Sequence, residues 1–297
     1  MDLNLNHLRI LRAVADAGSI SGGAERLMIS QPAVSKQLSV FESNLGLALF
    51  ERLPRGVRLT HSGTVLADYA RRIGTLEEQA VNAVQQLRGG SRGSLCVGAS
   101  TTIAVYLLPE VIVSYRRQYP DVQFHLTVAS SAQVAKGASE GELDVGLTEV
   151  DCADSTVDSR VFREDELVAI AAASHPLGRN REVTVRQLCA QPFVVRDTGS
   201  DTKSFVERAM AARGLTVSPA MSVGSTEAVK RAVAAGIGVA IVSRLCIDLE
   251  VQARLLKILP VGGLKIRRPL YRLTRKTMPE TNALRDFNAL VDAAATR

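Results

Sequence analysis

The stretch that decides the fold runs from Gly18 to Gly63 and reads GSISGGAERLMISQPAVSKQLSVFESNLGLALFERLPRGVRLTHSG. Ser19 and Ser30 each precede a helical pattern, where a serine hydroxyl can accept a hydrogen bond from the first free N–H groups of a helix. Pro32 falls in the first turn of the second helix, where its missing N–H costs nothing. We therefore expect two short helices separated by a turn at Met28–Ile29.

A basic, turn-rich segment follows these two helices. Arg52, Arg55 and Arg58 alternate there with the turn residues Pro54 and Gly56, a pattern that favours a short hairpin. Two helices joined by a tight turn and followed by such a hairpin, or wing, form a winged helix-turn-helix, which places its second helix in the major groove of DNA. The segment therefore predicts a DNA-binding domain.

Two glycines, Gly22 and Gly23, lie inside the first of these helices. Each should cost about 1 kcal/mol of helix stability relative to alanine. We expect close packing against the next helix to compensate for this cost.

The charge balance permits nucleic-acid binding without establishing it. The 297 residues carry a formal net charge of +6, and 46% of them are hydrophobic, enough for a sizeable core in two or three domains. Residues 1–92 hold 11 Lys/Arg against 8 Asp/Glu, a net charge of only +3. DNA binding must therefore be argued from where the charges lie. A second basic run, interpreted as the outer face of a strand, comprises Lys265, Arg267, Arg268, Arg272, Arg275 and Lys276.

Export and metal binding find no support in the sequence. The segment MDLNLNHLRI lacks the basic-then-apolar pattern of a secretion signal, and no apolar run reaches the roughly 20 residues that span a bilayer. We expect a cytoplasmic protein with no membrane partner and no cofactor. The cysteines form no CxxC pair, which favours reduced thiols over a metal site or disulfides; they are Cys96, Cys152, Cys189 and Cys246.

A long helix is predicted after Thr60, which can cap it. Apolar residues recur in this helix at spacings of three and four, a heptad-like pattern typical of helix pairing. We interpret this stripe as a dimerisation surface; the alternative is that it packs on its own domain. The stripe comprises Val65, Tyr69, Ile73, Leu76, Ala80, Ala83 and Leu87.

Beyond a glycine-rich hinge at 89–93, short apolar strands alternate with helices. This alternation predicts parallel βαβ units and an α/β class for the larger part of the chain. One continuous helix is expected over Ile103–Gln118, and the last helix over Asn282–Ala294.

Several motifs resemble the LysR-type transcriptional regulators: Ser30-Gln31-Pro32-Ala33-Val34-Ser35, Leu49-Phe50-Glu51-Arg52, Leu59-Thr60-His61-Ser62-Gly63 and Gly141-Glu142-Leu143-Asp144-Val145-Gly146. The resemblance implies a winged helix-turn-helix over 1–60, a linker helix over 61–88, the hinge, and a periplasmic-binding-protein-like α/β effector domain over 94–297. That domain would have two lobes, 94–163 with 268–297 and 164–267, joined by crossover strands at Arg163–Ala171 and Lys265–Thr274.

The resemblance implies that the helix from Gln31 enters the major groove, and its side chains suit that role. Gln31 and Gln37 can bond adenine edges, and Lys36 can bond guanine or a phosphate. The wing arginines suit phosphates or the minor groove. The candidate DNA-binding residues are Ser30, Gln31, Pro32, Ala33, Ser35, Lys36, Gln37, Arg52, Arg55 and Arg58.

A second site is expected in the cleft between the lobes, where hydroxyl-rich segments precede helices. Hydroxyls and free helix N–H groups suit an organic or inorganic anion. The alternative for each Ser or Thr is an ordinary helix cap. The candidate effector-binding residues are Ser100, Thr101, Thr102, Thr148, Arg196, Gly199, Ser200, Thr202 and Thr226.

The sequence thus predicts a regulator rather than an enzyme, since no catalytic arrangement is recognisable. Expected partners are a double-stranded DNA operator with dyad symmetry, a small-molecule effector and further copies of the chain. The resemblance implies a homodimer, commonly a homotetramer, and contact with RNA polymerase is an additional expectation. The rival interpretations are a solute-binding protein or enzyme on the same module, and a redox sensor using Cys189 and Cys246.

Overall fold

The computed structural model describes residues 3–87, 93–278 and 280–294; the side chains at 78–79, 82–83 and 85–87 also lie outside the description. The chain divides into two compact units, Met1–Leu87 and Arg88–Arg297, and each is described by itself. The expected hinge at 89–93 falls almost wholly outside the described residues.

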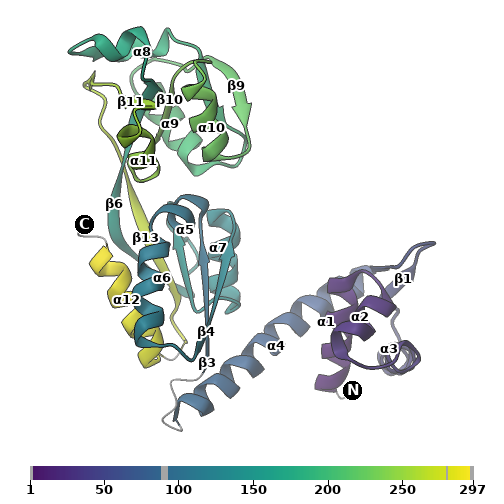
Figure 1. The fold of residues 1–297 in the computed structure, drawn as a ribbon. Coiled ribbons are helices and arrows are strands. Elements are labelled where there is room, and N and C mark those ends of the chain that lie inside the picture. Colours follow the sequence, from purple (N-terminus) through teal and green to yellow (C-terminus); the bar gives the residue numbers. More distant parts are fainter. Residues whose placement is uncertain (1–2, 88–92, 279, 295–297) are drawn as a thin grey trace. The chain divides into compact units, whose positions relative to one another are not determined.

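The first unit is a helix-turn-helix followed by a hairpin and a long helix (Figure 1). Its elements are α1 (Leu5–Ala17), α2 (Ile20–Leu27), α3 (Gln31–Leu45), β1 (Phe50–Arg52), β2 (Val57–Leu59) and α4 (His61–Leu87). The three expected caps are present: the hydroxyl of Ser19 accepts from Gly22 N at 3.1 Å, that of Ser30 from Ala33 N at 3.4 Å, and that of Thr60 from Gly63 N at 2.9 Å.

The glycine pair is explained by the packing of α2 on α1, the preceding helix rather than the following one. A Cβ added to Gly23 would lie 2.5 Å from Val14 Cγ2 and 2.9 Å from Val14 Cα. One added to Gly22 would lie 3.0 Å from Ala17 Cβ and from Ser19 Oγ. Gly23 is therefore required by close backbone approach, and Gly22 only by a tight fit.

The second unit has two lobes joined by two long strands. In lobe one, β3 runs parallel to both β4 and β5, as the alternating pattern predicts. The elements of lobe one are β3 (Gly93–Ala99), α5 (Thr101–Tyr106), α6 (Leu108–Gln118), β4 (Val122–Val128), α7 (Ser131–Glu140), β5 (Val145–Thr148) and α12 (Asn282–Ala294). Its core packs Tyr115, Phe124 and Phe287 against the apolar face of the sheet.

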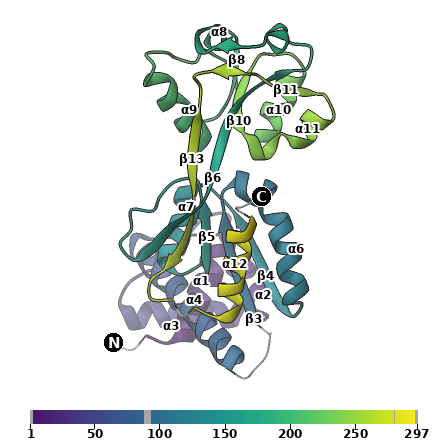
Figure 2. The same ribbon diagram turned by 90° about the vertical axis from the view of Figure 1, so that its left-hand side faces the viewer.

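The joining strands are β6 (Val157–Ala172) and β13 (Ile266–Arg275), which run antiparallel side by side between the lobes (Figure 2). Their pairing extends from Ile266 opposite Leu167 to Arg275 opposite Val157. Both expected crossovers are therefore present. The central sheet is mixed rather than purely parallel, because β13 pairs antiparallel with β5 and β10 pairs antiparallel with β6.

Lobe two lies between the two crossovers in sequence. Its strands β8 and β9 are parallel, and α9 and α10 pack around them. Its elements are η1 (Pro176–Arg179), β7 (Val183–Thr184), α8 (Val185–Cys189), β8 (Phe193–Arg196), α9 (Asp201–Ala211), β9 (Pro219–Val223), α10 (Thr226–Ala234), β10 (Ala240–Ser243), η2 (Arg244–Cys246), α11 (Asp248–Gln252), β11 (Leu256–Ile258) and β12 (Val261–Gly262).

The expectation of one continuous helix over Ile103–Gln118 is wrong. The structure has α5 and α6 separated at Leu107, whose backbone lies at φ −113° and ψ −45°. Pro109 stands at the start of α6, where it supplies no N–H to a preceding turn. The apolar periodicity continues through the break, which is why the pattern alone concealed it.

Candidate functional site

Helix α3 presents a polar face while its apolar face holds it in the unit. Val34, Leu38 and Phe41 are buried against the core of the first unit. Of the residues predicted to meet DNA, those fully exposed are Ser30, Gln31, Pro32 and Lys36, and those half-buried are Ala33 and Ser35. Ser30 caps α3, and the other five residues lie in its first two turns.

Gln37 does not point outward as expected. It is half-buried, and its Oε1 lies 3.0 Å from Nε2 of His7 on α1. Position 37 is three residues after Val34 and four before Phe41, so it lies beside the buried stripe and not opposite it. Gln37 therefore joins α3 to α1, and the expected base contact is not supported.

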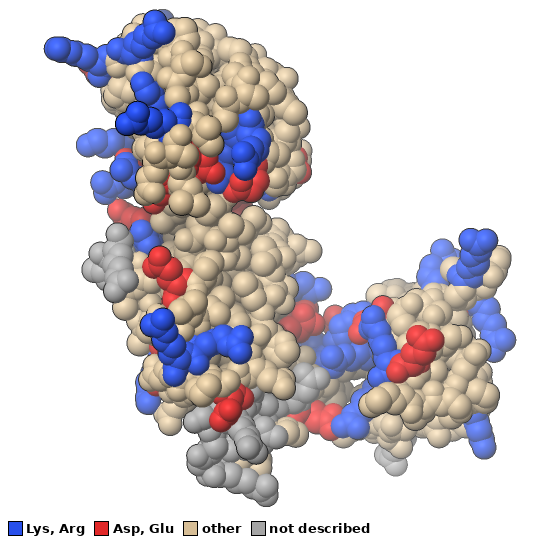
Figure 3. All heavy atoms as spheres, in the orientation of Figure 1, with Lys and Arg blue, Asp and Glu red and all other residues tan. Residues whose placement is uncertain are grey.

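The hairpin β1–β2 carries the three wing arginines. Arg52 and Arg55 are exposed, while Arg58 forms an ion pair with Glu51 at 2.7 Å. The hairpin is fixed to the start of the helix-turn-helix, because Val57 N donates to Gly18 O at 2.9 Å. Gly56 has φ +85°, and a Cβ there would lie 2.4 Å from Gly18 O. Figure 3 shows basic side chains projecting at the hairpin end of this unit.

The apolar stripe of α4 divides between two surroundings. Val65, Tyr69 and Leu76 are 48%, 53% and 63% exposed, and Ala80 is also exposed. Ile73, in contrast, packs on the core of its own unit, so its assignment to the dimerisation surface is not supported. The side chains of Ala83 and Leu87 lie outside the described residues.

Val81 and Val84, which were not in the predicted set, extend this surface. Both side chains are about half exposed. The exposed apolar face of α4 therefore continues along the helix beyond Ala80.

The second site is a pocket between the two lobes with a volume of about 150 Å³. This volume is below the 300–1,000 Å³ range of drug-sized ligand sites, so the pocket suits a small ligand. Its polar lining comes from both lobes: Ser100, Thr101, Thr102, Ala129, Ser130, Ser131, Glu149, Arg196, Gly199, Ser200, Asp201 and Thr202. Seven of the nine predicted effector-binding residues are among them.

Two buried polar atoms at this pocket have no hydrogen-bond partner. One is Oγ of Ser100, a residue only 4% exposed, and the other is Nε of Arg196, which lies 3.7 Å from Asp197 Oδ1 in an ion pair. Ser130 and Ser200 cap α7 and α9, whereas Ser100 stands before α5 without a side-chain cap bond. Ser200 is therefore an ordinary helix cap, whereas the Ser100 hydroxyl makes no cap bond.

Two predicted effector-binding residues do not line the pocket. Thr148 is 0% exposed, and its hydroxyl donates to Val150 O at 2.8 Å, so the interior of lobe one encloses it. Thr226 accepts a hydrogen bond from Arg196 Nη1 at 3.1 Å. Thr226 therefore positions the arginine from α10 and is not itself part of the lining.

Two carboxylates in the lining were not predicted. Glu149, 3% exposed, accepts a hydrogen bond from Ser131 Oγ at 3.2 Å, and Asp201 accepts from the same hydroxyl at 2.6 Å. Burial raises the pKa of Asp201, and the nearby charge of Glu149 adds to this effect. The Ser131–Asp201 bond also joins the lobes across the pocket. The sequence could have indicated Asp201, because it follows the helix cap Ser200. No residue near Glu149 in the sequence indicates that its side chain is buried.

The interpretation of the late basic run as the outer face of a strand is wrong for Arg268. Its side chain is 0% exposed and lies behind the pocket. Its Nε donates to Asp165 at 2.8 Å, its Nη1 donates to Thr202 at 2.9 Å, and its Nη2 lies 3.7 Å from Glu149. The pairing of β6 with β13 places Arg268 opposite Asp165, a relation that the sequence pattern does not reveal.

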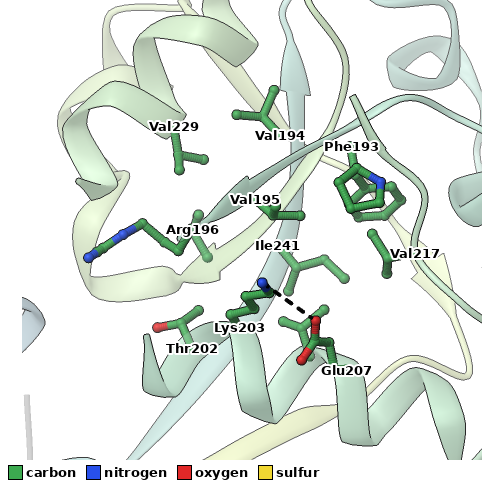
Figure 4. Close-up of a pocket in the computed structure, with 13 residues that line it drawn as sticks. Phe193, Val194, Val195, Arg196, Thr202, Lys203, Glu207, Val217, Val229 and Ile241 are labelled. Atoms are coloured by element: carbon green, nitrogen blue, oxygen red, sulfur yellow. Dashed lines mark ion pairs between the residues drawn. The ribbon is translucent and has the colours of Figure 1, made fainter. Parts of the chain in front are cut away.

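A second, mainly apolar pocket lies in lobe two beside the first. Arg196 and Thr202 border both pockets. Figure 4 shows Phe193, Val195, Val217 and other apolar side chains around this space, with Lys203 turned to Glu207. That ion pair measures 3.9 Å, so the charge of Lys203 is engaged on α9 itself.

Cysteine, metal and membrane roles find no support in the described part of the chain. Burial raises the pKa of Cys189, and raises that of Cys246 to about 12, and the two residues belong to different core clusters. Both thiols are thus kept from the reactive thiolate form. No group of described His, Cys, Asp or Glu residues could hold a metal ion. Among the described helices none is long and apolar enough to cross a membrane.

Comparison with known proteins decides the family. The model described as "Bacterial regulatory helix-turn-helix protein, lysR family" matches residues 5–64, and "LysR substrate binding domain" matches residues 88–296. The chain belongs to the LysR family of transcriptional regulators. This LysR-type regulator is therefore a DNA-binding protein with an effector-binding domain, as the motifs predicted.

Two full-length proteins and one separate regulatory domain illustrate the similarity. The RuBisCO operon transcriptional regulator of Allochromatium vinosum is 34% identical over 290 residues, 97% of this chain and 96% of the relative. Full-length CbnR complexed with its target DNA has a similar fold, with a TM-score of 0.75 at 22% identity over 99% of this chain and 100% of that one. The regulatory domain of Synechocystis PCC6803 CcmR in complex with 2-PG gives a TM-score of 0.64 at 23% identity, over 69% and 99%.

Proposed function

We propose that this LysR-type regulator senses a small oxyanion in the pocket between its lobes and that occupancy of the pocket changes its binding to DNA. The observation that carries the proposal is a pair of buried donors without a hydrogen bond, Ser100 Oγ and Arg196 Nε, at one small polar pocket. Arg196 Nε lies 3.7 Å from the exposed carboxylate of Asp197, too far for a hydrogen bond. Buried polar groups are normally hydrogen-bonded, so both atoms call for a partner from outside the chain. A carboxylate, phosphate or sulfur oxyanion supplies such acceptors.

The surroundings of these donors support an oxyanion. The N-termini of α7 and α9 open onto the pocket with Ser130, Gly199 and Ser200, and free N–H groups at a helix N-terminus favour negative charge. The guanidinium of Arg196 adds a positive charge, which Thr226 holds in place and which the exposed Asp197 balances only from 3.7 Å. A structural neighbour, the CcmR regulatory domain, was solved in complex with 2-PG, which makes 2-PG a reasonable probe.

We further propose that the regulator works as a homodimer on DNA sites with dyad symmetry. Among the described residues of α4, the apolar side chains of Val65, Tyr69, Leu76, Val81 and Val84 are 48–63% exposed. Pairing of two such faces would place two α3 helices on one DNA duplex. Leu76→Asp should convert the dimer to a monomer in analytical ultracentrifugation, and an unchanged sedimentation coefficient would contradict this assignment. Tetramers and contact with RNA polymerase remain extensions of this proposal.

The experiment that tests the sensor is a thermal-shift titration of the full-length chain. Small carboxylates, phosphates including 2-PG, and sulfur oxyanions are the ligands, and Arg196→Gln is the variant. We expect at least one anion to raise the melting temperature of the wild type by several degrees, and to lose this effect in the variant. No shift for any anion, or an equal shift in Arg196→Gln, would refute the proposed site. Arg186→Gln, on α8 outside the pocket, is the matched control.

A further inference from the structure

Two carboxylates that line the cleft pocket share a single hydroxyl donor. Glu149 and Asp201 both accept from the hydroxyl of Ser131, at 3.2 Å and 2.6 Å. A serine hydroxyl has one proton, so at any moment it serves only one of the two carboxylates. The charged neighbour of Glu149, Arg268, stays 3.7 Å away at Nη2, beyond hydrogen-bond distance. One carboxylate therefore faces the pocket without a full donor complement.

The charges around the pocket are also unbalanced. Two guanidinium groups, of Arg196 and Arg268, stand with four carboxylates: Glu149, Asp165, Asp201, and Asp197, which lies 3.7 Å from Arg196 Nε. Arg268 donates to Asp165 from Nε and to Thr202 from Nη1, while its Nη2 makes no hydrogen bond and lies 3.7 Å from Glu149. An anion that offers only acceptors would satisfy Ser100 and Arg196 but would place its oxygens against Glu149 and Asp201. Carboxylates repel a fully ionised oxyanion that lies against them, because both carry negative charge.

An anion that carries its own donor removes this conflict. One of its oxygens can accept from Ser100 Oγ and Arg196 Nε, while its O–H or N–H group donates to Glu149 or Asp201. We propose that the pocket selects oxyanions bearing a hydrogen-bond donor and excludes oxyanions that are fully deprotonated. This inference rests on the proposed anion site and specifies the class of ligand that the site takes.

The sharpest test compares two nearly isosteric ions by calorimetry on the full-length chain at pH 7. Inorganic phosphate keeps at least one proton at this pH, whereas sulfate keeps none. We expect phosphate to bind at least tenfold more tightly than sulfate. Glycolate, glycine and acetate form a second series, with an O–H donor, an N–H donor and no donor. This series shows whether the pocket recognises a hydroxyl or an ammonium group. Glycolate and glycine should both bind more tightly than acetate.

Two substitutions should relax the selection. Glu149→Gln and Asp201→Asn each replace an acceptor by an amide that can donate, so sulfate should bind at least tenfold better and the phosphate preference should shrink accordingly. Asp201 is half-buried and the safer variant for folding, which circular dichroism verifies. Glu207→Gln is the matched control, because it removes the same charge from an exposed position of α9 outside this pocket. It should leave both affinities unchanged.

The outcomes separate this inference from the proposed function. Sulfate and acetate binding as tightly as their donor-bearing counterparts, or an unchanged preference in both variants, overturns the selection and leaves an anion site in place. Absence of binding by all five probes overturns the selection as well. If the wider anion panel also gives no thermal shift, the sensor proposal falls with it.

Discussion

Helix α3 and the cleft pocket are both polar sites, but they are built in opposite ways. On α3, Gln31 and Lys36 are exposed, and the helix is fixed by a local cap and by its buried apolar stripe. At the pocket, Ser100 and Arg268 are buried, and the contacts join residues far apart in sequence, such as Arg268 and Thr202, 66 positions apart. Function and stability should therefore be separable on α3 and coupled at the pocket.

The largest effect is expected behind the pocket. Arg268→Met would leave Asp165 and Glu149 buried without their cation, and breaking a buried pair in this way costs about 3–5 kcal/mol. The adjacent Arg267 is exposed and pairs with exposed Glu164 at 3.2 Å, so Arg267→Met should cost less than about 1 kcal/mol. Urea unfolding followed by circular dichroism measures both variants. Equal losses would show that the buried cluster has no special role in stability.

A smaller loss is expected from the glycine pair of α2. In Gly23→Ala the new Cβ would overlap Val14 and force α1 and α2 apart, at a cost of about 1–3 kcal/mol. In Gly22→Ala the contacts of 3.0 Å need only a slight adjustment, and the better helix propensity of alanine, about 1 kcal/mol, offsets much of it. The two unfolding free energies should differ in this order; the reverse order would contradict the close α1–α2 approach.

On α3 the expected effect is on binding alone. Lys36→Ala removes an exposed cation, so affinity for a DNA duplex selected from a random pool should fall about fivefold, the equivalent of roughly 1 kcal/mol. The unfolding free energy should change by less than about 0.5 kcal/mol. Fluorescence anisotropy and urea unfolding on the same preparation test the two halves of this statement. Unchanged affinity at moderate salt would remove Lys36 from the DNA-binding face.

The smallest effect is a dependence of stability on pH. Burial holds the pKa of Asp201 above its usual range, so the folded state binds this proton more tightly than the unfolded state. The contribution of Asp201 to stability is then fully present below the unfolded pKa, near 4, and is lost as pH rises through the folded pKa. Asp201→Asn should remove this term, so its stability should fall less than that of the wild type between pH 4 and pH 7. Parallel curves would contradict a raised pKa.

The same contrast explains which features of the two sites could be predicted from the sequence. The caps at Ser19, Ser30 and Thr60 and the apolar stripe of α3 depend on neighbours within a few residues, and they are predictable from the pattern. The prediction that Gln37 faces outward was wrong, because Gln37 lies at the edge of the buried stripe. At such an edge the helical period does not decide between a buried and an exposed side chain.

Burial at the pocket depends on strand register instead. Seven of the residues that line the pocket could be anticipated because hydroxyl groups before helices are a local signal. Arg268 and Glu149 could not, since only the pairing of β6 with β13 and the enclosure of the pocket by both lobes bury them. An arginine within a basic run gives no local sign that its partner, Asp165, lies 103 residues away.

We propose that occupancy of the cleft pocket changes the affinity of the regulator for DNA. The most direct measurement is the Kd of the full-length regulator for a selected DNA duplex, by fluorescence anisotropy, with and without a saturating amount of the anion that gives the largest thermal shift. We predict at least a threefold change in Kd for the wild type and none for Arg196→Gln. An unchanged Kd in the wild type, or the same change in both proteins, would contradict the account.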